Sequence, residues 1–126
     1  MGRVSAAHTS PTAPQDRAWH WSGTDTFDES LEHGGWAAVA NAHAWHDPED
    51  DPDHDPPRER NAYKLPHHEI VDGRLRVVWR GVVAAMTVVN GARGGVDIPE
   101  EDLEAVYRHL AEHYEQFDEE PPPFRG

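Results

Sequence analysis

The chain has 126 residues, no cysteine and a formal net charge of −13. This length allows one domain with a modest core, and the lack of cysteine excludes disulfides and thiolate metal sites. The negative charge argues against direct nucleic-acid binding, because Lys and Arg side chains on phosphates supply most of that affinity. No apolar run approaches the roughly 20 residues that span a bilayer, so we expect a protein that is cytoplasmic when synthesised, with no membrane partner.

The N-terminal residues 1–18 are small, polar and proline-containing, which predicts a flexible arm. A single domain is expected over residues 19–118, followed by a proline-rich, extended tail over 119–126. Three large aromatic side chains stand at the start of this domain, and they pack either across its own core or on a partner. They are Trp19, Trp21 and Phe27.

The next segment predicts a short helix from Asp28 through Leu31, which Gly34-Gly35 should stop. Residues 36–45 are apolar and alanine-rich, and their periodicity does not decide between helix and strand. Residues 46–60 contain four prolines and many acidic residues, so they predict a solvent-exposed acidic loop.

A β-hairpin is the strongest local prediction. Two β-prone runs, 63–71 and 74–79, flank the pair Asp72-Gly73, and such a pair suits a tight turn in which both positions need positive φ. Pro66 has no backbone donor, so its strand should lie at a sheet edge or carry a bulge.

Two helices should follow the hairpin. The first covers residues 82–90 and is apolar on most faces, with Gly91 at the position of a left-handed C-terminal cap. The second covers about 99–117, and Asp97 with Glu100 has the spacing of a capping box at its start. One face of this helix is apolar at spacings of three and four, through Leu103, Val106, Tyr107, Leu110, Tyr114 and Phe117. The fold class is therefore α+β, a β-hairpin packed on two or three helices.

Nothing in the pattern predicts a catalytic residue or an enzyme. All four serines lie at or before Ser30 and there is no cysteine, so the many histidines have no positioned nucleophile to activate. The turn at 91–95 is glycine-rich, but the helix after it begins with acids that would repel a phosphate.

The ten histidines raise the question of a metal. His109 and His113 are four residues apart on the last helix, a spacing at which two imidazoles can share an ion, and Asp102 lies on the same flank. No further ligand is adjacent, and a half-buried histidine bordering an apolar face is ordinary. The sequence by itself therefore assigns no metal ligand and no cofactor.

The acidic loop offers only nonspecific attraction for cations. Asp51, Asp53 and Asp55 match the first ligands of a calcium loop, yet Pro56 and Ala62 stand where that loop needs Gly and Glu. Three nearby histidines could trap a transition metal only with low specificity; they are His43, His46 and His54.

Arginines cluster between residues 74 and 93, a stretch without acidic residues. Such a cluster either pairs with the acidic last helix or forms an ionic contact surface. Because aromatic and arginine side chains dominate interfaces, the expected protein-interaction residues are Trp19, Trp21, Arg74, Arg76, Trp79, Arg80 and Arg93.

Five sequence blocks follow one another in the C-terminal half: Ala62-Tyr-Lys-Leu-Pro-His-His-Glu, Val71-Asp-Gly-Arg-Leu, Arg80-Gly-Val-Val-Ala-Ala-Met, Asn90-Gly-Ala-Arg-Gly-Gly-Val-Asp-Ile-Pro and Tyr107-Arg-His-Leu. In this order they resemble a module of tailed-phage and prophage head-morphogenesis proteins, similar to segments that accompany prohead maturation proteases and capsid-region proteins. The resemblance covers about residues 60–122.

The resemblance implies a head accessory protein that acts by protein–protein contact in virion assembly or shell stabilisation. Its partner would be a viral capsid or other head protein, with self-association in the context of a shell and a place in the virion. The chain has no room for a protease domain, so protease activity does not carry over. The alternative is an acidic soluble inhibitor or DNA mimic acting on a host enzyme.

Overall fold

The computed structural model describes residues 3–4, 11–19, 21, 25–91 and 98–124. The elements follow in the order β1 (Arg3–Val4), α1 (Asp25–Ala42), β2 (His43–His46), η1 (Pro48–Asp50), η2 (Arg60–Ala62), β3 (Tyr63–Pro66), β4 (His68–Val71), β5 (Arg74–Val77), α2 (Trp79–Val89) and α3 (Glu100–Gln116). The predicted α+β class is confirmed. None of the described helices has both the length and the apolar character needed to cross a lipid bilayer.

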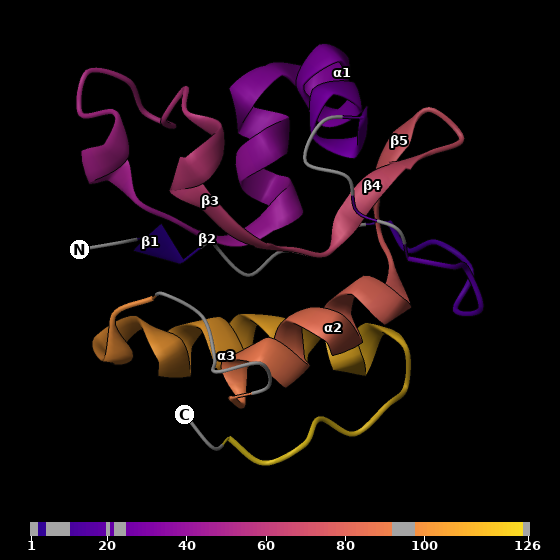
Figure 1. Ribbon diagram of the computed structural model, residues 1–126. Coiled ribbons are helices and arrows are strands. Elements are labelled where there is room, and N and C mark those ends of the chain that lie inside the picture. Colours follow the sequence, from indigo (N-terminus) through magenta and orange to yellow (C-terminus); the bar gives the residue numbers. More distant parts are fainter. Residues whose placement is uncertain (1–2, 5–10, 20, 22–24, 92–97, 125–126) are drawn as a thin grey trace.

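The strands form a middle layer between two helical layers. Figure 1 shows α1 on one side of the strands and the pair α2 and α3 on the other. One sheet has the order β1-β2-β3 and a second contains β4 and β5, all antiparallel. All four residues of β2 are buried, as expected for a strand covered on both faces.

Two apolar clusters fill the spaces between the layers. The larger lies between the strands and the α2–α3 pair, and it includes Trp45, Leu65, Val82, Met86 and Leu110. The smaller lies under α1 and consists of Phe27, Val39, Ala62 and Tyr63, with four partly buried neighbours. The amphipathic face predicted for the last helix is confirmed, because its apolar members are buried in the larger cluster or packed against it.

Glycines interrupt the first helix at the predicted place. Gly34 and Gly35 have non-helical backbone angles inside α1, and Gly35 has a φ of 71°. The run 36–45, which the sequence left undecided, contains both structures: it continues α1 through Ala42 and then enters β2.

The hairpin prediction is correct in its turn and wrong in its strand lengths. Asp72 and Gly73 have φ angles of 53° and 76°, and β4 pairs with β5 across them. However, the expected strand 63–71 is divided, because β3 pairs with β2 and only β4 enters the hairpin. Pro66 lies in an edge strand, as predicted. The second expected strand ends at Val77, since Trp79 already begins α2.

The two C-terminal helices end close to their predicted bounds. The helix α2 begins three residues before the predicted 82, and Gly91 follows its end with a φ of 102°, as a left-handed cap requires. The N-terminal cap position of α3 is Pro99, without a side-chain hydrogen bond. The expected capping residue Asp97 lies outside the described residues, as does most of the turn 91–95.

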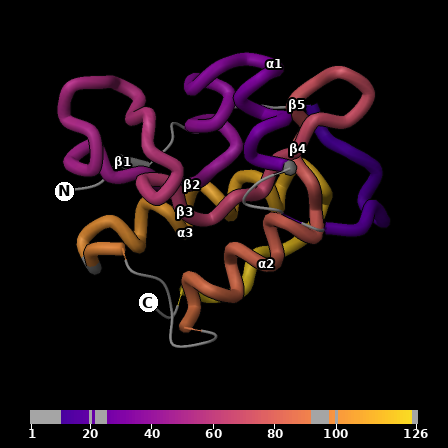
Figure 2. Tube along the Cα trace, turned by 45° about the horizontal axis from the view of Figure 1, so that its top comes forward, coloured from indigo at the N-terminus to yellow at the C-terminus, as the bar shows by residue number. Residues whose placement is uncertain are grey.

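Both ends of the described chain lie against the domain. Residues 11–13 run beside β5, where Ala13 N–H donates to Val77 O over 2.9 Å and Val77 N–H to Pro11 O over 2.8 Å. In Figure 2 this indigo segment lies at the same end of the molecule as β4 and β5. The tail passes along the helical pair, since Tyr107 donates its hydroxyl to Pro122 O over 2.6 Å.

Candidate metal centre

Four histidine rings meet where β4 faces α3. His68 is the first residue of β4 and His67 directly precedes it, while His109 and His113 are one helical turn apart on α3. Backbone hydrogen bonds fix the strand side: His67 N–H donates to Ala42 O over 2.9 Å, and His67 O accepts from Val78 N–H over 3.0 Å. These bonds tie His67 to the end of α1 and to the residue that precedes α2, so its position does not depend on a loose loop.

The four rings are buried and in mutual contact. Their exposed fractions are 0% for His67 and His68, 3% for His109 and 1% for His113. The ring centroids of His67 lie 4.4 Å from His68, 5.2 Å from His109 and 4.9 Å from His113. Buried polar rings of this kind need partners for their nitrogens, because an unmatched polar group in a core is costly.

The nitrogens of this histidine cluster converge closely enough to hold one ion. One ring nitrogen from each of His67, His68 and His113 lies within 4.8 Å of the other two. The Nε2 atoms of His67 and His109 are 3.2 Å apart. Three imidazole nitrogens in one place form a typical donor set for zinc and similar ions.

Hydrogen bonds on the far side of two rings set their tautomers. His67 Nδ1 donates to Leu65 O over 3.0 Å, and His113 Nδ1 donates to Gln116 Oε1 over 2.6 Å. Carbonyl oxygens only accept, so each Nδ1 carries the proton and each Nε2 presents a lone pair. Metal-binding histidines are oriented in this way by an outer carbonyl or carboxylate.

The backbone at Leu65 contributes to this arrangement. Its φ is 62°, a left-handed conformation that is uncommon for a residue with a branched side chain. Leu65 lies within β3, two residues before His67, and its carbonyl accepts the hydrogen bond from His67 Nδ1. Such outliers often lie beside functional sites.

Electrostatics keep His67 in the neutral form that a metal ion requires. Burial lowers the pKa of His67 well below its usual 6.5, and the neighbouring imidazoles of His68, His109 and His113 lower it further. A neutral imidazole has the free lone pair that a metal ion requires. At neutral pH, His67 is therefore neutral and has no proton to lose before it could bind an ion.

The sequence pointed to two of these four histidines but assigned neither as a metal ligand. It singled out His109 and His113 and found no further ligand, whereas the fold places His67 and His68 against them. Asp102, the acid predicted beside the pair, instead accepts a hydrogen bond from Trp45 Nε1 over 3.0 Å. The doublet His67-His68 was visible in the sequence, but its partner His109 is 42 residues away.

The other predicted histidine group does not converge. His43 and His46 are buried in β2, where His43 Nδ1 donates to Val39 O over 2.8 Å and burial lowers the pKa of His43 to about 4. His54 is exposed and pairs with Asp51, with 2.9 Å between Nδ1 and Oδ2.

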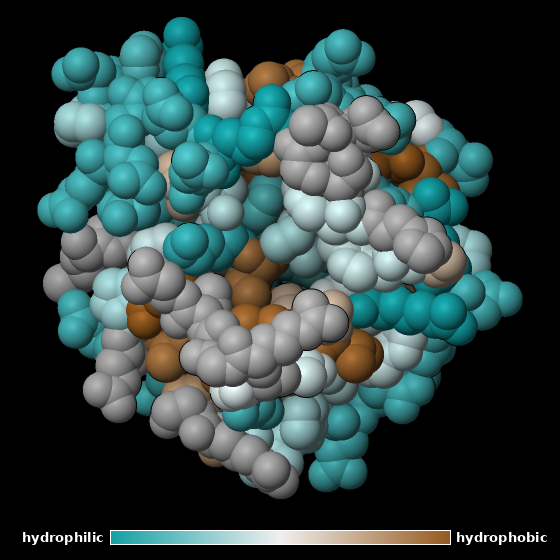
Figure 3. All heavy atoms as spheres, viewed as in Figure 1, coloured by the Kyte–Doolittle hydropathy of each residue, from teal (hydrophilic) through white to brown (hydrophobic). Residues whose placement is uncertain are grey.

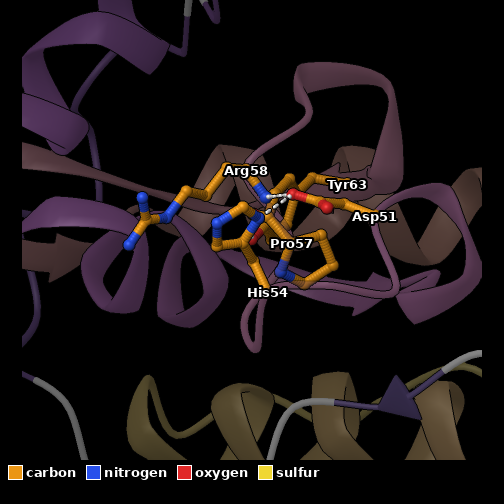
Figure 4. Close-up of polar contacts among 5 residues, drawn as sticks. All are labelled: Asp51, His54, Pro57, Arg58 and Tyr63. Atoms are coloured by element: carbon orange, nitrogen blue, oxygen red, sulfur yellow. Dashed lines mark hydrogen bonds and ion pairs between the residues drawn. The ribbon is translucent and has the colours of Figure 1, made fainter.

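The acidic loop is more ordered than its composition suggests. Figure 4 shows the carboxylate of Asp51 bonded both to the ring of His54 and to the backbone N–H of Arg58, and the hydroxyl of Tyr63 donates to Pro57 O in the same loop. The hydrogen bond from Arg58 N–H is the main cause that lowers the pKa of Asp51. Figure 3 shows hydrophilic side chains gathered over this loop, and no calcium-type convergence of its acids is found among the described residues.

The three predicted tryptophans all contact the domain itself. Trp19 stacks on Trp21 with 5.8 Å between ring centroids and lies over Gly81 of α2. Trp21 meets the ring of His43 edge-on at 5.1 Å. Trp79 lies 4.9 Å from Tyr114 and 5.3 Å from Phe117, again between ring centroids. These contacts agree with the first of the two alternatives for the aromatic segment, packing across the domain's own core.

The predicted arginines divide into two kinds. Arg74 and Arg80 are exposed. Arg76 is used internally, because its guanidinium donates to Val71 O over 3.0 Å and to Thr12 O over 3.3 Å. Arg93 lies outside the described residues.

Comparisons with protein-family models, with curated proteins and with solved structures find no match to this chain. The resemblance to head-morphogenesis modules therefore stays a sequence-based expectation.

Proposed function

We propose that this protein binds a divalent transition-metal ion, zinc above all, at the histidine cluster. One observation carries the proposal: imidazole nitrogens of His67, His68 and His113 lie within 4.8 Å of one another. Imidazole donors suit zinc, copper and nickel, whereas magnesium and calcium prefer oxygen ligands. The outer hydrogen bonds of His67 and His113 support the same reading, because they leave Nε2 available on both rings.

The location of the cluster suggests what the ion does. It lies between β4 and α3, two elements that are distant in sequence, and a shared ion would cross-link them. A cross-link of this kind stabilises the folded chain by the free energy of metal binding, because the unfolded chain holds no preformed site. The ion would thus secure the α2–α3 layer to the strand layer.

The test uses the untagged full-length protein, because a histidine tag would bind the same metals. After extraction with a strong chelator, zinc is titrated by calorimetry and the bound metal is counted by elemental analysis. We expect one equivalent of zinc. His113→Ala should lose this site, and the matched control His54→Ala, which removes an exposed histidine, should retain it. Equal zinc binding by both variants would refute the proposal.

Thermal unfolding gives a second measure of the same site. At a free zinc concentration about 1,000 times the Kd, binding adds about 4 kcal/mol to the free energy of unfolding. For a chain of this size that is roughly 12–20 °C in Tm, at about 3–5 °C per kcal/mol. A Tm that is unchanged by zinc after chelation would contradict the proposal.

We further propose protein–protein contact as a second function, with a viral capsid or other head protein as the partner. The observation that favours it is the exposure of Arg74 and Arg80, which form no ion pair among the described residues. Exposed arginines suit an acidic partner surface, because the planar guanidinium pairs with carboxylates. The sequence blocks described above supply the choice of partner. In this proposal the chain acts as an accessory protein and has no catalytic activity.

Co-sedimentation with assembled shells tests this second function. Arg80→Glu should weaken binding, and more strongly at low salt, because exposed charges are screened as salt rises. The control is Arg108→Glu, which alters an exposed arginine that is already paired with Glu104 on α3. Shells that bind neither the wild type nor the control at any salt concentration would overturn the proposal.

A further inference from the structure

We infer that His109 is the fourth ligand of the centre, so that the ion is held tetrahedrally in a closed, structural site. This inference rests on the proposed metal binding and deepens it. Three protein ligands with an open position are the arrangement of catalytic zinc, whereas four protein ligands are that of structural zinc. The role of His109 therefore decides what kind of centre this is.

The first support is the distance between two nitrogens. Zinc binds imidazole nitrogen at about 2.0–2.1 Å, so two ligands at a tetrahedral angle have nitrogens about 3.3–3.4 Å apart. The Nε2 atoms of His67 and His109 are 3.2 Å apart. The distance between them is thus close to the length of one edge of the coordination tetrahedron.

The same distance also fits a hydrogen bond between the two rings. The tautomers show how the metal-free and the metal-bound cluster would be related. His67 Nδ1 donates to Leu65 O, so His67 Nε2 only accepts. Without an ion, His109 Nε2–H is the donor in the 3.2 Å contact. To ligate, His109 moves its proton to Nδ1, and both Nε2 lone pairs then face the ion. The ring stays neutral throughout, so this step releases no net proton.

The helix geometry supports His109 as well. Residues four apart on a helix lie on one face, and the ring centroids of His109 and His113 are 4.9 Å apart. His113 belongs to the group of three histidines whose nitrogens converge within 4.8 Å, and His109 stands outside that group. Ligation by His109 therefore requires its ring to turn towards the ion, which would bring two ligands from residues 67–68 together with two from α3.

Two acids on the same elements are engaged elsewhere. Glu69, the neighbour of His68 on β4, pairs with Arg17. Asp102 on α3 accepts from Trp45. A histidine is therefore the better candidate for the fourth position, which makes the centre an all-imidazole one. That donor set favours zinc, cobalt, nickel or copper over oxygen-preferring ions.

Burial separates the closed site from an open one. The four rings have exposed fractions of 0–3%, and the ring nitrogens His68 Nδ1, His109 Nδ1 and His113 Nε2 are shielded from solvent. A catalytic ion needs a position that water and substrate can reach. This centre instead suits an ion that joins β4 to α3 across 42 residues of chain.

Cobalt substitution in the untagged full-length protein tests the inference. Co(II) reports its coordination, because tetrahedral sites absorb visible light much more strongly than five- or six-coordinate ones. We expect a tetrahedral spectrum for the wild type that does not change when azide or imidazole is added. His109→Ala should bind Co(II) at least about tenfold more weakly, and its spectrum should change when imidazole fills the vacated position.

The outcomes separate the two proposals. Wild-type protein that binds neither Co(II) nor Zn(II) would overturn the metal function itself. Wild-type binding with a spectrum that responds to azide would overturn only the closed site and leave a three-histidine centre. The same conclusion follows if His109→Ala matches the wild type in affinity and spectrum. Because the azide experiment needs no variant, the inference remains falsifiable even if His109→Ala does not fold.

Discussion

Gly81 and Trp19 are in close contact. Replacing a helical glycine by alanine usually stabilises a protein, but we expect Gly81→Ala to destabilise this one as long as Trp19 is present. Gly81 is buried in the first turn of α2, and the ring of Trp19 lies directly over it. A Cβ added at Gly81 would come within 2.9 Å of Cδ2 and Cε3 of Trp19. Carbon atoms pack at about 3.5–4.0 Å, so Gly81→Ala should push the Trp19 ring away from the helix.

Two opposing effects determine the magnitude. Alanine is favoured over glycine in a helix by up to about 1 kcal/mol. Against this, a tryptophan buries about 150–250 Å², equivalent to an upper limit of about 4–6 kcal/mol at 25 cal/mol per Å². If displacement exposes about half of that area, the loss is roughly 2–3 kcal/mol. We therefore expect Gly81→Ala to destabilise the protein by about 1–2 kcal/mol overall.

A double-mutant cycle by urea denaturation measures this coupling. In a Trp19→Ala background the steric conflict is gone, so Gly81→Ala should become stabilising by up to about 1 kcal/mol. Ala84, which is exposed on α2, supplies the control, because Ala84→Gly should cost a similar amount with or without Trp19. If Gly81→Ala destabilises both backgrounds equally, Trp19 is not the cause and the reasoning fails.

Three further changes test the core and its buried polar groups. Leu110→Ala should lower the free energy of unfolding by about 2–5 kcal/mol, because Leu110 is fully buried; a loss below 1 kcal/mol in urea denaturation would argue against the assigned core. Tyr63→Phe removes the hydroxyl that bonds to Pro57 O and should cost about 1 kcal/mol, with earlier proteolytic cleavage in the acidic loop. Burial lowers the pKa of His43 in the folded protein to about 4, whereas its pKa in the unfolded chain is about 6.5. Between these two pH values the unfolded state binds more protons than the folded state. The free energy of unfolding should therefore fall by up to about 1.4 kcal/mol per pH unit as the pH drops through this window. In His43→Leu that slope should be smaller when the two proteins are compared at pH 7 and pH 5, and an unchanged slope would show that His43 does not contribute to it.

The sequence by itself determined the features that depend on neighbouring residues. Asp72-Gly73 specified the turn because its backbone needs positive φ at two successive positions. Gly34-Gly35 interrupted the first helix, and the three- and four-residue spacing of α3 marked its buried face. Each of these features depends on a few neighbouring residues, so it can be recognised without knowledge of the rest of the chain.

Only the tertiary structure decided how distant segments combine. The run 63–71 is equally β-prone throughout, yet its first half pairs with β2 and its second half with β5, because partner choice depends on the layers on both sides. The histidine cluster has the same origin. His109 and His113 showed their shared face in the sequence, but their contact with His67 joins residues 42 positions apart, and no local pattern specifies which strand a helix will cover. The proposed set of metal ligands therefore becomes visible only when packing has brought residues 67–68 and α3 together.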